Sequence, residues 1–347
     1  MIPTLYWEND TVMILDQRKL PASTVFIPCR DMRRVIYCIQ TLATRGAPAI
    51  GVAAAMGLAL AARAIRVKDP VKFRAHFRER AEVMRAARPT AVNLSWAVDR
   101  CLALLEVGPD NVDTLKAMLK RESQIMLDDD VAINRAMGKH GAALVPDGAT
   151  VLTHCNAGSL ATGGYGTALG VVYAAKEAGK KVAVIADETR PLLQGSRLTA
   201  WEMVTEGIPV QVAVDGAVGA IMSKGLVDLV VVGSDRIAMN GDVANKIGTF
   251  NVALQAKRHK VPFYVAAPLS TVDPEAGSGA DIPIEERDPR EVLELAGKRI
   301  APQGADALNF AFDVTPHDLV AAIITEAGVL RPPFKTSLKK AKAGALK

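Results

Sequence analysis

The chain has 347 residues, of which 50% are apolar, so it is long enough for two domains and can build a sizeable core. Its formal net charge is +5, but the last thirteen residues carry five lysines and no acid, which leaves 37 cationic and 37 acidic residues elsewhere. Aromatic residues make up 5% and are not interleaved with basic ones. These features exclude a disordered chain and give no support for a nucleic-acid partner.

Four cysteines are scattered without a Cys-x-x-Cys pair, which favours reduced thiols in the cytoplasm over disulfides or a zinc site. We therefore expect a cytoplasmic protein and no metal site. The first ten residues lack the basic and apolar regions of a signal peptide. An uncharged run, Gly46 to Ala62, is at the short limit for a membrane span, and its many Ala and Gly residues favour a buried helix and no membrane partner.

Residues 1–143 are predicted to form a mainly helical N-terminal domain with a short β-rich start. Apolar runs at 12–15 and 24–27 predict a hairpin. Helical spacing then predicts segments at 31–43, 48–66, 70–87, 93–106 and 111–143, with prolines between most of them.

After the turn at 146–148 the pattern becomes that of a second domain, predicted over 144–333. Short β-branched runs alternate with helical stretches, which is typical of a parallel sheet with crossover helices. Strands are predicted at 149–153, 181–186, 209–214, 227–232 and 262–267, and helices at 160–178, 196–206, 216–224, 245–259 and 318–327. We expect an α/β protein with a Rossmann-like C-terminal catalytic domain and a Lys-rich disordered tail at 334–347.

The polar segment after the strand at 149–153 contains the leading candidate for chemistry. In open parallel sheets, ligands bind outside the carboxyl ends of the strands. Cys155 stands two residues beyond this strand and therefore faces that crevice. A glycine pattern at 164–170 imitates a dinucleotide fingerprint, but about ten residues separate it from the strand, which argues against NAD.

Asp235 follows the strand at 227–232 and leaves the same sheet edge beside Cys155. A thiol and a carboxylate facing one cleft suggest proton transfer, although Asp235 equally fits the cap of a turn. Asn245 and Lys246 are placed at the start of the helix predicted at 245–259, where they could hold a phosphate or another oxygen.

Two basic positions in the first half are open to more than one interpretation. Arg45, Gly46 and Ala47 lie at a helix start that contains Pro48, where free N–H groups and a guanidinium suit a phosphate, but a turn with a surface arginine fits as well. Arg88 lies between a helix end and a proline turn, which by itself favours helix capping.

The loop at 187–197 follows the strand at 181–186 and carries two acids, two arginines, a glutamine and a serine. This is more polar chemistry than a connection requires, and the loop leaves the same sheet edge as Cys155. We therefore interpret it as functional, with a solvated loop that contains salt bridges as the alternative.

Six motifs in order along the chain resemble those of methylthioribose-1-phosphate isomerase, a family related to the regulatory subunits of the translation-initiation guanine-nucleotide exchange factor. The motifs are TRGAPAIG (44–51), ARPTAVNL (87–94), THCNAGSLAT (153–162), DETRPLLQGSRLTAWE (187–202), GSDRI (233–237) and GDVANKIGT (241–249). The resemblance implies a cofactor-free, homodimeric aldose–ketose isomerase of methionine salvage that converts 5-methylthioribose 1-phosphate to 5-methylthioribulose 1-phosphate.

The resemblance also implies roles for individual residues. It makes Cys155 and Asp235 the catalytic pair. It assigns substrate and phosphate contacts to Arg45, Gly46, Ala47, Arg88, Gln194, Asn245 and Lys246. The phosphate on the anomeric carbon prevents opening to a free aldehyde, so an acid and a base are required, and we expect both in a site shielded from water.

Two alternatives remain open on the sequence. A sister isomerase of 5-deoxyribose 1-phosphate or ribose 1,5-bisphosphate would share the catalytic pair and differ where C5 lies. A non-enzymatic regulatory subunit of the same fold would have no use for both Cys155 and Asp235.

Overall fold

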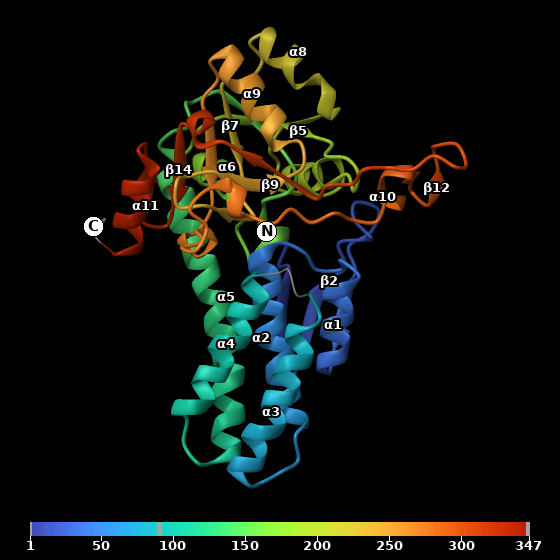
Figure 1. Cartoon of the computed structure of the whole chain (residues 1–347), viewed down its shortest axis with the longest axis vertical. Helices are drawn as coiled ribbons and strands as arrows, with labels where there is room; N and C mark the ends of the chain where they lie inside the picture. The colour runs from blue at the N-terminus through green and yellow to red at the C-terminus, as the bar shows by residue number, and fades with distance from the viewer. Residues whose placement is uncertain (1, 89–91, 345–347) are drawn as a thin grey trace. The chain divides into compact units, whose positions relative to one another are not determined.

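The computed structural model describes residues 2–88 and 92–344, which divide into two compact units (Figure 1). Unit 1 comprises residues 1–132 and 159–166, and unit 2 comprises residues 133–158 and 167–347. The division falls inside the 31-residue helix α5 (Val112–Ala142), whereas the sequence places it after residue 143. Both units combine helices with sheet, so the predicted α/β class is confirmed.

Unit 1 begins with a three-stranded antiparallel sheet. Its strands are β1 (Leu5–Glu8), β2 (Thr11–Leu15) and β3 (Phe26–Cys29), and the predicted hairpin is the β2–β3 pair. The helices that follow are α1 (Met32–Gln40), α2 (Ala47–Ala64), α3 (Pro70–Arg85), α4 (Val92–Val107) and α5. All five lie within a few residues of the predicted segments.

Helix α2 is the centre of the unit 1 core, as its composition predicts. It is long and apolar enough to cross a membrane, but 78% of it is buried within the structure. Its small residues let neighbours approach closely, since a Cβ on Gly51 would lie only 2.9 Å from the carbonyl oxygen of Asn93 in α4. Helices α2, α3 and α4 pack side by side (Figure 1).

Unit 2 is organised around a seven-stranded sheet of order β15-β14-β10-β7-β4-β5-β6. The strands are β4 (Ala149–Thr153), β5 (Val182–Asp187), β6 (Val210–Ala213), β7 (Leu229–Val232), β10 (Phe263–Ala266), β14 (Ala322–Thr325) and β15 (Gly328–Leu330). All neighbours pair in parallel except β14 and β15. Counted along the chain from β4 to β14, the strands lie in the order 3-2-1-4-5-6, so the topology reverses between β4 and β7.

The crossover helices and a second, smaller sheet complete unit 2. The helices are α6 (Ala168–Glu177), α7 (Ala200–Thr205), α8 (Val218–Ser223) and α9 (Thr249–His259), with a π-helical turn at Gly195–Thr199 before α7. The smaller antiparallel sheet contains β8 (Arg236–Ile237), β9 (Val243–Lys246) and β13 (Phe312–Thr315). Between β10 and β13 lie α10 (Arg290–Leu293) and the hairpin of β11 (Glu294–Leu295) and β12 (Lys298–Arg299).

The helix predicted at 318–327 is wrong, because this segment contains β14. All four residues of β14 are buried between β10 and β15. A strand buried on both faces has no alternation, so its apolar run cannot be distinguished from a helix by periodicity.

The prediction of a disordered tail is also wrong for residues 334–342, which form helix α11 (Phe334–Lys342). Phe334, Leu338 and Ala341 recur at helical spacing and are all buried in the unit 2 core. Gly241 leaves room for the Phe334 side chain, and the ammonium group of Lys342 donates to the carbonyl oxygen of Val272 at 2.9 Å. The apolar stripe therefore outweighs the lysines on the opposite face.

Candidate active site

Cys155 and Asp235 follow β4 and β7, the neighbouring strands between which the order of the sheet reverses. The segments beyond these strands lie against each other. A Cβ on Gly233 would lie 2.7 Å from the Cβ of Ala157, so only glycine fits at this approach. The Cys155 loop and the Asp235 segment thus meet at the edge where open parallel sheets bind ligands.

The backbone of Cys155 adopts a left-handed conformation with φ of 64°. A residue other than glycine pays about 1–2 kcal/mol for this conformation. Two threonines hold it: the N–H of Cys155 donates to Thr189 Oγ1 at 2.8 Å, and Thr199 Oγ1 donates to the Cys155 carbonyl at 2.7 Å. Cys155 is half-buried, whereas the other three cysteines are fully buried.

The residue after Cys155 is anchored to a buried carboxylate. Asn156 Nδ2 donates to Glu202 Oε1 at 2.8 Å, and the Tyr173 hydroxyl donates to Oε2 at 2.8 Å. A side chain on Gly158 would collide with the Glu202 carboxylate. The loop is therefore fixed immediately downstream of the thiol as well as at its own peptide groups.

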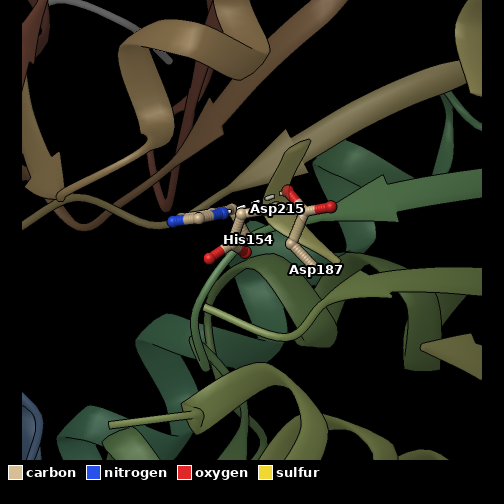
Figure 2. A group of neighbouring side chains, drawn as sticks. All are labelled: His154, Asp187 and Asp215. Carbon is tan, nitrogen blue, oxygen red and sulfur yellow. Dashed lines mark hydrogen bonds and ion pairs between the residues drawn. The ribbon is translucent and has the colours of Figure 1, made fainter. Parts of the chain in front are cut away.

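The residue before Cys155 belongs to a cluster supplied by three neighbouring strands. His154, Asp187 and Asp215 lie at or just beyond the carboxyl ends of β4, β5 and β6 (Figure 2). His154 Nδ1 lies 3.0 Å from Asp187 Oδ2, and Nε2 lies 2.8 Å from the carbonyl oxygen of Ile247. The two oxygens of Asp215 accept the backbone N–H groups of residues 189 and 190.

These three side chains are close enough to share a metal ion, but their hydrogen bonds already explain the arrangement. Nε2 of His154 faces a carbonyl oxygen, which only accepts, so Nε2 carries a proton. The other nitrogen, Nδ1, is already hydrogen-bonded to Asp187 Oδ2. Both Asp215 oxygens are engaged by N–H donors. The donor set therefore suits a hydrogen-bonded cluster better than a metal centre.

Asp235 is positioned by its backbone, with its N–H donating to the Ala244 carbonyl of β9 at 3.0 Å. Its side chain is exposed in the structure of the single chain. The expectation of a carboxylate shielded from water is therefore wrong for the chain by itself. The reason is that Asp235 stands where the main sheet passes into the small sheet, beyond the last buried residues of β7.

Gln194 lies in the tight loop after β5 and is buried. Gly195, which follows it, packs directly on the Asp187 carbonyl, where no side chain would fit. Within the described part of the chain, Oε1 of Gln194 has no hydrogen-bond partner. Leaving a buried polar atom without a hydrogen bond costs about 1–3 kcal/mol. A ligand hydroxyl that donates to Oε1 would remove this cost.

Asn245 and Lys246 lie on β9, and not at a helix start as predicted. Helix α9 begins three residues later because residues 243–246 pair with β13. Asn245 Nδ2 donates to Thr249 Oγ1 at 3.0 Å. The Lys246 ammonium donates to the Ala311 carbonyl at 2.7 Å and lies 4.6 Å from the centre of the Phe312 ring.

The start of α9 is occupied by a protein carboxylate. Asp313 Oδ2 accepts the N–H of Gly248 at 2.7 Å, and Oδ1 accepts that of Phe250 at 3.0 Å. Burial raises the pKa of Asp313, and these two N–H groups only partly offset that rise. The anion position at this helix start is thus filled from within the chain.

Arg45, Gly46 and Ala47 lie at the start of α2 in unit 1. Gly46 is the N-cap with φ of 94°, and a Cβ there would collide with the backbone of Ala161. As a glycine, Gly46 offers no side-chain acceptor to the first N–H groups of this helix. Arg88 is half-buried three residues after α3, and the proline turn predicted after it lies outside the described residues.

Comparisons with known proteins identify the family of this chain. The sequence model of the Initiation factor 2 subunit family matches residues 43–332. The methylthioribose-1-phosphate isomerase of Desulforamulus reducens is 55% identical over 337 residues, which cover 97% of each chain. The solved 5-methylthioribose 1-phosphate isomerase of Pyrococcus horikoshii has a TM-score of 0.93 at 44% identity, covering 99% of this chain and 96% of that one.

A third relative carries a different name. The structure of translation initiation factor eIF-2B, subunit delta, from A. fulgidus has a TM-score of 0.90 at 45% identity and covers 98% of this chain and 99% of that one. Fold and matches together define an α/β protein of the initiation factor 2 subunit family. Within it, the chain belongs to the methylthioribose-1-phosphate isomerases.

Sequence reasoning missed the contacts that hold Cys155. His154 was visible only as the neighbour of Cys155, and Asp187 as one of two acids in a polar loop. Their contact joins residues 33 positions apart and depends on the pairing of β4 with β5. The usable signal was topological, since both residues stand at the carboxyl ends of predicted strands.

Proposed function

We propose that this chain is an aldose–ketose isomerase that converts 5-methylthioribose 1-phosphate to 5-methylthioribulose 1-phosphate in methionine salvage. The observation that carries the proposal is the position of Cys155 and Asp235 beyond β4 and β7, where the sheet order reverses. The chain is also 55% identical to the methylthioribose-1-phosphate isomerase of Desulforamulus reducens. The layout we propose is a helical N-terminal domain with a β-rich start and a Rossmann-like catalytic domain.

The proposed mechanism gives the two residues different tasks. The phosphate on C1 prevents the sugar from opening to a free aldehyde, so a proton must be delivered to the ring as the C1–O bond breaks. Asp235 donates and later accepts this proton, and its exposure leaves it accessible to a ligand. Cys155, held in its left-handed conformation by Thr189 and Thr199, handles the hydrogen that moves between C2 and C1.

The remaining site residues bind the substrate in this proposal. Arg45, Gly46, Ala47 and Arg88 contribute phosphate and substrate contacts, supported by a helix start whose N-cap glycine offers no side-chain acceptor. Gln194 offers its buried Oε1 to a sugar hydroxyl. Asn245 and Lys246 supply further polar contacts from β9.

We further propose that the protein is a cytoplasmic homodimer that needs no metal or nicotinamide cofactor. Exposed valines on α7 and the edge strand β6 support a self-association surface. Val204 is 70% exposed and Val212 is 49% exposed, and β6 pairs only with β5 in the described chain. Light scattering of the purified protein tests the dimer directly.

The experiment that tests the function is ketose formation from 5-methylthioribose 1-phosphate without added metal or NAD. We expect turnover by the wild type and its loss in Cys155→Ser. Cys101→Ser is the matched control, because Cys101 is buried in α4, where burial raises the pKa of its thiol to about 12. Loss of activity in both variants, or in neither, would contradict the assignment of Cys155.

Parallel assays separate the alternatives. Faster turnover of 5-deoxyribose 1-phosphate or ribose 1,5-bisphosphate would identify a sister isomerase. No turnover of any of the three would favour a regulatory subunit, an alternative that the name of the A. fulgidus relative keeps relevant.

A further inference from the structure

The mechanism proposed above leaves one buried pair of titratable groups unused. His154 and Asp187 are 1% and 0% exposed, and they contact each other one residue before Cys155 in the chain (Figure 2). Burying two ionisable side chains is costly unless they are paired, so the pair calls for an explanation. Both residues lie in unit 2 together with Cys155.

The hydrogen bonds of His154 fix the number of protons on this pair. Nε2 lies 2.8 Å from the Ile247 carbonyl oxygen, so Nε2 must carry a proton. Nδ1 lies 3.0 Å from Asp187 Oδ2, and a hydrogen bond there requires a second proton between the two atoms. The pair therefore holds two protons and has no net charge, whichever atom carries the second one.

The surroundings favour the form in which Asp187 is the neutral acid. Its Oδ1 is buried and has no hydrogen-bond partner among the described residues, a poor environment for a full carboxylate. Burial raises the pKa of Asp187 despite the opposing effect of His154.

The charged groups around the pair also favour the form that keeps both protons. Asp215 acts on both members, Glu188 on Asp187, and Asp313 lies close enough to interact with His154. All three are acids, and the nearby cation Lys246 acts on Asp313. A negative surrounding opposes the loss of either proton.

The pair also ties the Cys155 loop to the segment before α9. The imidazole bridges Asp187 at the end of β5 and the carbonyl of Ile247, and it packs against Gly248, where a Cβ would lie 2.7 Å from its Cε1. Cys155 is the next residue, in a strained conformation that its surroundings must enforce. Thr189 Oγ1, which accepts the N–H of Cys155, itself donates to the Asp187 carbonyl at 3.0 Å.

We infer that His154 and Asp187 are positioning residues that set the place of the Cys155 thiol through a shared pair of protons. The inference rests on the proposed function for its kinetic consequences. Removing one proton leaves two lone pairs facing each other between Nδ1 and Oδ2, which releases His154 and with it Cys155. A displacement of about 1 Å at a reacting group can cost about 100-fold in rate.

Two substitutions of Asp187 distinguish the effect of the shared proton from the effect of side-chain size. In Asp187→Asn the amide donates to Nδ1 while Nε2 still donates to Ile247, so kcat should stay within about 5-fold of the wild type. In Asp187→Ala the second hydrogen bond is lost, and kcat should fall about 10- to 100-fold with KM little changed. Equal loss in both variants would show that the carboxylate charge is needed and would overturn the inference, as would full activity of Asp187→Ala.

The pH profile provides a readout that a structural role alone would not move. The wild type should lose kcat at alkaline pH as the pair gives up a proton, and this step should be missing in Asp187→Asn. Identical alkaline limbs would contradict the shared-proton pair.

A measurement without substrate keeps this inference distinct from the proposed function. The chain has five histidines, so ¹⁵N-histidine labelling resolves His154 by difference from His154→Gln. We expect hydrogen on Nε2 of His154 at neutral pH in both the wild type and Asp187→Asn. An Nε2 without hydrogen would overturn the inference, whereas failure of the isomerase assay alone would leave this result standing.

Discussion

Helices α2 and α9 begin in similar ways, but at α9 a carboxylate of the chain occupies the helix start. Each has a glycine N-cap with positive φ, 94° at Gly46 and 103° at Gly248, and neither cap bonds through its own side chain. At α9 the carboxylate of Asp313, 65 residues further along the chain, accepts two of the N–H groups. At α2 the N-cap Gly46 offers no side-chain acceptor, and the residue before it is the cation Arg45.

The difference shows that a helix start does not define a phosphate site by itself. Free N–H groups attract an anion, but the chain can supply that anion from a distant strand. Asp313 does so at α9 because β13 pairs with β9 and delivers the carboxylate beside Gly248. The proposed function assigns the phosphate contact to α2, and the start of α9 is a structural element held by Asp313.

Among the substitutions that test this contrast, the largest effect should come from Gly46→Ala. The new Cβ would collide with the backbone of Ala161, and the backbone of the alanine would have to adopt a positive φ. We expect kcat/KM to fall about 100-fold or more, mostly through KM, because a shift of about 1 Å at a positioned group is that costly. Steady-state kinetics on the sugar phosphate measures this.

Gly179→Ala is the matched control for that substitution. Gly179 also has positive φ, 83°, but a Cβ there meets no atom within 4 Å. It should cost about 1–2 kcal/mol of unfolding free energy and leave KM unchanged. Equal KM values for Gly46→Ala and Gly179→Ala would remove the α2 start from phosphate binding.

A moderate effect should separate Arg45 from Lys246. Arg45→Gln should raise KM about 10- to 100-fold, since hydrogen bonds to charged groups contribute about 1.5–3 kcal/mol. Lys246→Gln should raise KM less than 10-fold, because its ammonium already donates to the Ala311 carbonyl. A larger effect at Lys246 would reverse the contrast between the two helix starts.

The smallest effect should come from Asp313→Asn. The amide retains one acceptor for two N–H groups, so we expect a loss of about 1–2 kcal/mol in unfolding free energy, measured with urea, and a KM within about 3-fold of the wild type. A KM increase of tenfold or more would show that the start of α9 serves the substrate.

The same variant has a defined pH dependence. The pKa of Asp313 is raised in the folded state, chiefly by burial, so its bound proton stabilises the fold. That stability is present below the unfolded pKa of about 3.9 and is lost as pH rises through the folded pKa. The advantage of the wild type over Asp313→Asn should therefore shrink between these two values.

Much of the framework could be predicted from local pattern. The strand at 149–153 and the helices of unit 1 were found because their apolar periodicity and proline boundaries are local properties. Strand β14 was missed because burial on both faces removes the alternation. Helix α11 was missed because its lysines hide the stripe formed by Phe334, Leu338 and Ala341.

The features of the candidate site also divide into those that the sequence predicts and those that it does not. Cys155 and Asp235 could be selected because the carboxyl ends of parallel strands share one edge. The bond between His154 and Asp187 and the cap of α9 by Asp313 could not be predicted, because each joins residues far apart in sequence through sheet pairing. The exposure of Asp235 likewise follows from the small sheet formed by β8, β9 and β13, which the sequence did not predict.

The most direct test of the account is turnover of 5-methylthioribose 1-phosphate by Asp235→Asn, measured together with the dissociation constant of that substrate. The amide keeps the size of the side chain but cannot give or take the proton that opens the ring. We predict a fall in kcat of about 10²- to 10⁴-fold with binding within threefold of the wild type. Near-normal turnover would contradict the central claim that Asp235 and Cys155 share the chemistry.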